Sequence, residues 1–105
     1  MTDPDLTSVK ADDSGKELSF ITVIGQDRKG IVARVSTLLY EHEINIEDIA
    51  QKVMHGQFVM IMLVDFRDSP SDLEDVKAGL DRIAAELELR IQIQHEDLFK
   101  MMHRV

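Results

Sequence analysis

Runs of apolar and β-branched residues predict four β-strands. The first, ELSFITVIG, ends in a polar cluster that indicates a loop. The run QFVMIMLVDF is almost wholly apolar, whereas the two remaining runs mix apolar and polar residues, as half-exposed strands do. A two-residue separation at His55-Gly56 predicts a short turn between two of the strands. The predicted strands span residues 17–25, 44–54, 57–66 and 89–93.

Three other stretches predict helices. An apolar stripe at helical spacing begins at Ile31 and predicts a helix to about His42, with its apolar face formed by Ile31, Val32, Val35, Leu38 and Leu39. A second stripe follows Ser71-Asp72-Leu73-Glu74, which has the form of a capping box led by the serine. Its members are Leu73, Val76, Leu80, Ile83, Ala84 and Leu87, with Gly79 among them as a position for close packing. The end of the chain, EDLFKMMHRV, predicts a short helix over about 96–104.

The element order β-α-β-β-α-β indicates an α+β fold of the ferredoxin-like class. Short connections and right-handed crossovers give an antiparallel sheet of order 4-1-3-2 with both helices on one face. The first and third strands are apolar on both sides, as central strands are, and the other two resemble edge strands. Because the helices cover only one face, we expect the C-terminal helix, a partner chain or both to cover the other.

Composition limits the classes of function. The chain has 105 residues, 44% hydrophobic and 30% charged, with a formal net charge of −8, which fits one small domain and disfavours nucleic acid and anionic membranes as partners. Cysteine is absent, and no apolar run approaches the roughly 20 residues of a membrane helix. Residues 1–16 are polar and aperiodic and predict a disordered tail without a signal peptide, so we expect a cytoplasmic domain over 17–105.

The loop Gln26-Asp27-Arg28-Lys29-Gly30 is the first candidate for chemistry. It leads into a predicted helix N-terminus, whose free N–H groups attract anions such as a carboxylate. Arg28 and Lys29 add positive charge, Gly30 permits close approach, and Asp27 could accept from an ammonium group, so the loop suits an amino acid. The simpler interpretation is a surface turn in which Asp27 is the N-cap.

Two motifs resemble those of ACT domains, the small ligand-sensing modules of amino-acid metabolism. Asp27-Arg28-Lys29-Gly30-Ile31 is similar to a D-R-x-G-(I/V) signature, and Glu43-Ile44-Asn45-Ile46 is similar to a (G)-(I/V)-N-I signature. The stretch from Ile91 to Phe99, with residues 102–105, further resembles a stand-alone ACT family of unassigned function. Lys29 stands where many relatives have proline, and Asp27 replaces the asparagine of some amino-acid sites.

The resemblance implies a dimer that binds its effector at the subunit interface. In members that bind amino acids, the positions of Asp27, Gly30 and Asn45 contact the ligand, and the asparagine comes from the neighbouring subunit. The candidate binding residues are therefore Asp27, Arg28, Lys29, Gly30, Ile31 and Asn45. Without the resemblance, Asn45 would be a turn residue bonded to its own backbone. Because Asn45 begins the second strand, we expect it at the end of the sheet opposite the 26–30 loop, so only a second chain could bring the two together.

Metal binding and catalysis have weaker support. The four histidines lack ligand spacing, and the topology places His42 and His95 at one end of the sheet and His55 at the other. An acylphosphatase-like use of Arg28 with Asn45 meets the same separation, and the glutamates and aspartates of 41–48 are more simply solvated charges. We therefore predict no metal, cofactor or catalytic residue.

The sequence thus predicts a homodimeric, non-enzymatic regulatory domain that senses an amino acid or similar metabolite and signals to a protein partner. The alternative is a protein-interaction module without a ligand. The sequence names neither the effector nor the partner.

Overall fold

The computed structural model describes residues 15–102 of the chain, and every predicted strand and helix has a counterpart there. The strands belong to one four-stranded antiparallel sheet of order β3-β4-β2-β5, which confirms the predicted order and fold class. In chain order the elements are β2 (Leu18–Gln26), α2 (Ile31–Glu41), β3 (Asn45–Met54), β4 (Gln57–Asp65), α3 (Leu73–Leu87), β5 (Leu89–His95) and α4 (Glu96–Met102).

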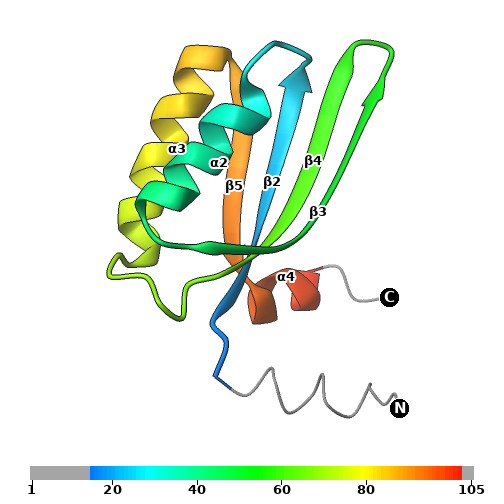
Figure 1. Cartoon of the computed structure of the whole chain (residues 1–105). Coiled ribbons are helices and arrows are strands. Elements are labelled where there is room, and N and C mark those ends of the chain that lie inside the picture. Colours follow the sequence, from blue (N-terminus) through cyan, green and yellow to red (C-terminus); the bar gives the residue numbers. More distant parts are fainter. Residues whose placement is uncertain (1–14, 103–105) are drawn as a thin grey trace, which may run out of the picture.

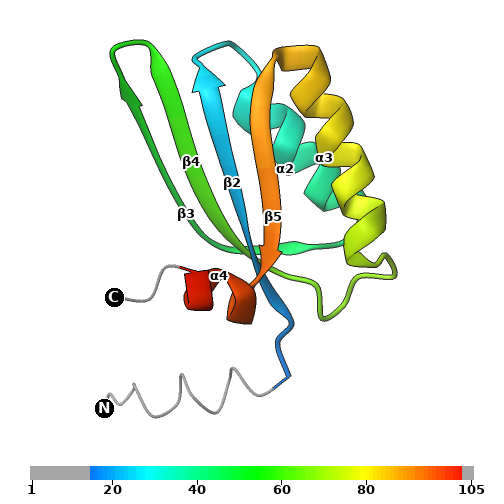
Figure 2. The same cartoon turned by 180° about the vertical axis from the view of Figure 1, so that it is seen from behind.

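Helices α2 and α3 lie side by side on one face of the sheet (Figures 1 and 2). The core fills the space between these helices and the sheet, because the predicted stripes of both helices face strand residues such as Met60 and Met62, which are fully buried. In the orientation of Figure 1, we call the end with the 26–30 loop and the 55–56 turn the upper end, and the end with α4 the lower end.

Gly79 lets the two helices approach closely, which confirms the predicted reason for a glycine inside α3. A Cβ at this position would lie 2.7 Å from a terminal methyl carbon of Leu38 on α2. The glycine itself is buried in this contact. The helix-propensity cost of about 1 kcal/mol relative to alanine therefore accompanies tight packing of α2 against α3.

The predicted cap of α3 is wrong by one residue. Asp72, not Ser71, is the N-cap: its carboxylate accepts from the Asp75 backbone N–H at 2.9 Å, and the Asp75 carboxylate accepts from the Asp72 N–H. Ser71 is engaged elsewhere, since its hydroxyl lies 2.6 Å from Nδ1 of His42 at the end of α2. The serine therefore joins α2 to the α3 loop instead of capping the helix.

The opposite face of the sheet carries no helix above α4 among residues 15–102 (Figure 2). Ile24 and Ile61 on this face are 43% and 39% exposed, whereas Met60 and Met62 on the helix side are 0% exposed. Edge strand β3 is exposed along most of its length, as predicted for an edge. This uncovered apolar surface, which we call the open face, is larger than a surface of isolated apolar residues.

The chain ends fall partly outside the described residues. Most of the predicted tail, residues 1–14, and the last part of the predicted C-terminal helix, residues 103–104, lie outside the described range. Lys16, which the sequence places in the tail, contacts the sheet through Glu47.

Candidate functional site

The 26–30 loop connects β2 to α2 at the upper end of the sheet. The Asp27 backbone N–H donates to the Gly56 carbonyl at 2.9 Å, so the loop rests on the turn between β3 and β4. Gly30 is the N-cap of α2, with φ 88° in the left-handed region and no side-chain cap. The interpretation of Asp27 as N-cap is therefore wrong, and the first turn of α2 keeps N–H groups that no side chain caps.

The loop's charged side chains differ in their engagement. Nη2 of Arg28 lies 2.7 Å from Oε1 of Glu88, the residue after α3, which itself has a positive φ. Within residues 15–102, the side chains of Asp27 and Lys29 make no hydrogen bond or ion pair. Arg28 thus ties the loop to the end of α3, while Asp27 and Lys29 offer one charge of each sign to a ligand.

Two further residues join the loop to the helix layer. Ile31, the first residue of α2, is 2% exposed and anchors the helix start in the core, so only its backbone could face a ligand. Gly30 borders a groove between α2 and α3 that Arg34, Glu41 and Arg82 also line. Arg34 is paired there with Glu86 across the two helices.

Asn45 lies at the lower end, so the predicted separation from its own 26–30 loop is confirmed. The strand register pairs Asn45 with Asp65, and Asp65 with Leu18 at the start of β2, whereas Gln26 at the end of β2 pairs with Gln57 beside the hairpin turn. Within one chain, Asn45 and the loop therefore stand at opposite ends of the sheet.

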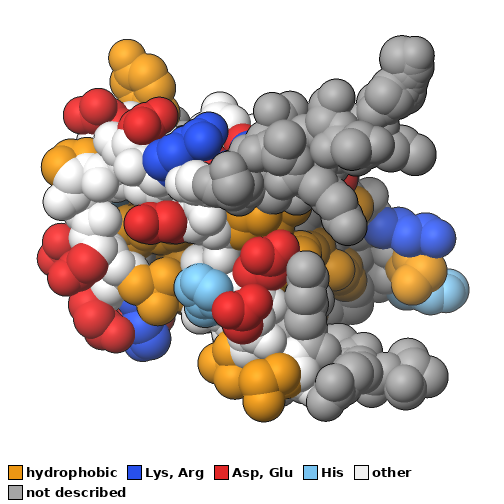
Figure 3. Space-filling view, turned by 90° about the horizontal axis from the view of Figure 1, so that it is seen from below, with side chains coloured by type: hydrophobic (Ala, Val, Ile, Leu, Met, Phe, Trp, Pro, Cys, Tyr) orange, Lys and Arg blue, Asp and Glu red, His pale blue; other side chains and the backbone are white. Residues whose placement is uncertain are grey.

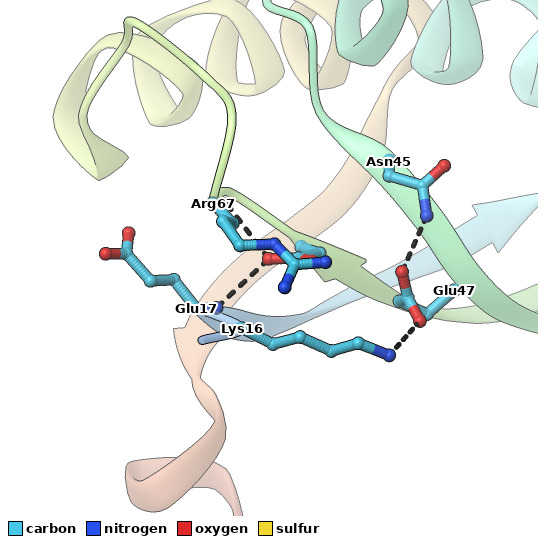
Figure 4. Close-up of polar contacts among 6 residues, drawn as sticks. Lys16, Glu17, Asn45, Glu47 and Arg67 are labelled. Atoms are coloured by element: carbon cyan, nitrogen blue, oxygen red, sulfur yellow. Dashed lines mark hydrogen bonds and ion pairs between the residues drawn. The ribbon is translucent and has the colours of Figure 1, made fainter. Parts of the chain in front are cut away.

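Asn45 belongs to a chain of polar contacts that the sequence did not indicate (Figure 4). Its amide nitrogen donates to Oε2 of Glu47 at 2.6 Å, and Nζ of Lys16 lies 2.9 Å from Oε1 of the same carboxylate. The bond from Lys16, and then the bond from Asn45, hold the pKa of Glu47 below its ordinary value. The prediction of a solvated Glu47 is wrong, because its side chain is only 21% exposed and paired.

A buried carboxylate lies next to this chain. Asp65 is 4% exposed, and its Oδ1 accepts from the backbone N–H groups of Glu17 and Arg67 at 3.0 and 2.9 Å (Figure 4). The Arg67 guanidinium lies 3.5 Å from the other oxygen. Acidic side chains are spread over this end of the molecule (Figure 3). Lys16 and Arg67 thus offset part of a negative lower end, in contrast to the cationic 26–30 loop.

The histidines are distributed as the topology predicted. His42 and His95 are at the lower end and His55 is in the upper turn. No group of three or more potential metal-ligating side chains is placed to share an ion among residues 15–102. The acylphosphatase-like pairing also lacks geometry, because Arg28 is paired with Glu88 and Asn45 stands at the other end of the sheet.

The βαββαβ order, the sheet order and the helix start at a left-handed glycine define a ferredoxin-like ligand-binding class of domain. Residues 17–94 match the ACT domain family, and the chain belongs to that family. ACT domains are in general regulatory domains that bind small ligands such as amino acids, and they commonly dimerise. In the described part of the chain, every helix is too short or too polar to cross a bilayer.

Known relatives share most of the chain. A UPF0237 protein of Methanocaldococcus jannaschii is 47% identical over 85 residues, which cover 81% of this chain and 94% of the relative. An ACT domain protein from Streptococcus pneumoniae has a similar structure, with a TM-score of 0.68, 33% identity, and coverage of 80% of this chain and 94% of that one. The regulatory subunit of aspartate kinase from Thermus thermophilus is similar at a TM-score of 0.59 and 25% identity, over 74% of this chain and 51% of that chain.

Proposed function

We propose that this chain is a homodimeric regulatory domain that binds an amino acid or a similar small metabolite. In this proposal each site takes the 26–30 loop from one chain and Asn45 from the other, and binding alters the dimer so that a protein partner senses it. The observation that carries the proposal is the pairing of an uncapped helix start at Gly30 with free charges on Asp27 and Lys29.

The chemistry of the two halves is complementary to an amino acid. The first N–H groups of α2, with Lys29 beside them, suit a carboxylate, and the Asp27 carboxylate suits an ammonium group. At the other half, the Asn45 amide nitrogen already donates to Glu47, so its carbonyl oxygen is the group left to accept from the ligand. Arg28 has a positioning role here, because Glu88 already holds it.

A thermal-shift screen of the amino acids tests the proposal. A ligand at 100 times its Kd stabilises the folded state by about 2.7 kcal/mol, which is a shift of roughly 10–20 °C for a domain of this size. Asp27→Ala and Asn45→Ala should each abolish the shift. Asp81→Ala, which removes an exposed carboxylate from α3, is the matched control and should retain it. No shift with any amino acid in a confirmed dimer would overturn the proposal.

The second candidate is an interaction module without a ligand. The apolar open face favours it, because Ile24 and Ile61 are exposed without any need for a ligand to explain them. A stable dimer that responds to no small molecule would support this alternative.

A further inference from the structure

The open face is built of three rows of side chains that run across the four strands. Paired residues of neighbouring antiparallel strands project to the same side, and Ile21, Val23, Met60 and Met62 mark the helix side by their full burial. The residues between them form the open face. The upper row is Lys52, Val59, Ile24 and Arg90; the middle row is Ala50, Ile61, Thr22 and Gln92; and the lower row is Asp48, Leu63, Phe20 and Gln94.

Each row has an apolar centre and polar ends. Two shallow hollows over the apolar centre are lined by residues of β2, β3 and β4, including Phe20, Ala50 and Ile61. The charges lie at the corners: Lys52 and Arg90 end the upper row, and Asp48 begins the lower one. Oδ1 of Asp48 accepts from the next backbone N–H at 2.8 Å, which leaves its other oxygen for a partner. A partner for this face needs an apolar centre and the opposite charges at the corners.

From this pattern we propose that the occupant of the open face is a second copy of the chain, related by a two-fold axis along the middle row. Such an axis places each middle-row residue over its own copy and exchanges the upper row with the lower row. Lys52 then faces Asp48 of the second copy, Arg90 faces Gln94, and Ile24 and Val59 face Phe20 and Leu63. Every apolar residue meets an apolar residue, and each Lys52 meets a carboxylate.

The charges select this axis over the others. An axis along the strands would exchange β3 with β5 and place Lys52 over Arg90. The two diagonal axes would place either Lys52 or Arg90 over its own copy. Because like charges in contact oppose association, only the axis along the middle row makes the face complementary to itself.

This pairing brings the upper end of one chain to the lower end of the other. The 26–30 loop and the turn beneath it then lie at the end of the partner's sheet where Asn45 and Glu47 stand. The geometry is the one that the two-chain ligand site requires, and only this connection rests on the proposed function. The cationic loop also meets the acidic end.

Single cysteines test the axis, because the full-length chain contains no cysteine. Ile61→Cys lies on the axis and should form a disulfide-linked dimer on mild oxidation, since its two copies face each other. Tyr40→Cys is the control: Tyr40 is 82% exposed on α2 and should not cross-link. Cross-linking of the Tyr40 variant without the Ile61 variant would overturn the pairing. A monomer whose Ile61→Cys thiol resists alkylation would also overturn it, because a segment of the same chain would then cover the face.

Charge reversal tests the register. Lys52→Asp and Asp48→Lys should each weaken the dimer by about tenfold or more in sedimentation, because each places like charges together twice per dimer. The double variant should recover most of the affinity, and a double variant no tighter than the singles would overturn the register. The amino-acid screen is independent of these results: cross-linking without a thermal shift contradicts the proposed function alone, and a shift without cross-linking contradicts the pairing alone.

Discussion

Replacement of Gly30 tests the geometry of the loop directly. Its φ of 88° lies in the left-handed region, where a side chain costs about 1–2 kcal/mol. Nothing lies within 4 Å of the position that a Cβ would take, so Gly30→Ala carries this backbone cost without a packing cost. Alanine also restricts the unfolded chain, which offsets a few tenths of the penalty. We expect the free energy of unfolding to fall by about 1 kcal/mol.

The measurement is denaturant and thermal unfolding at a fixed protein concentration, where this loss corresponds to a Tm lower by about 4–8 °C. Gly56→Ala is the matched control, because Gly56 has φ 78° and equally open surroundings in the hairpin turn, and it should lose a similar amount. Gly30→Asn should recover most of the loss, since asparagine tolerates the left-handed region. If Gly30→Ala is neutral while Gly56→Ala is destabilised, the left-handed start of α2 is refuted.

Three further predictions concern stability. Gly25→Ala should cost about 1–3 kcal/mol in urea unfolding, because its Cβ would lie 2.6 Å from Cδ2 and 3.3 Å from the backbone Cα of Leu89; an unchanged midpoint would contradict this packing. Glu47, with its lowered pKa, contributes stability that is present above its ordinary pKa of 4.5 and is lost as the pH falls below it; Glu47→Gln should therefore flatten the acid dependence of unfolding between about pH 5 and pH 3, and an unaltered slope would count against the ion pair. Asp72→Ala should lower the unfolding free energy by about 1 kcal/mol, and Glu74→Ala by less than half as much; the reverse order would restore the predicted serine cap.

The fold could be predicted because its signals are local and repeated. The apolar runs of the two central strands and the stripes starting at Ile31 and Leu73 specify both the elements and the faces that they bury. Strand order then followed from which runs were apolar on both sides. These signals need only the residues within one element, which is why the bounds agree to within about two residues.

The errors have a common physical cause, since each depends on a contact between distant segments. Ser71 and Asp72 are both good caps by type, and the pairing of Ser71 with His42 across the fold leaves the role to Asp72. Lys16 looks like part of a tail until β3 brings Glu47 beside it. The position of Asn45 relative to the loop was predictable because strand direction alone determines it.

The central claim is that each ligand site takes residues from two chains, and mixed dimers test it most directly. Asp27→Ala and Asn45→Ala chains are mixed and allowed to exchange subunits, and binding of the amino acid with the largest thermal shift is measured by calorimetry. A mixed dimer holds one intact site, formed by the loop of the Asn45→Ala chain and the asparagine of the Asp27→Ala chain. Each variant alone should be silent, and the mixture should recover about one quarter of the wild-type sites, because half of the dimers are mixed. A mixture as silent as its parents would contradict the account.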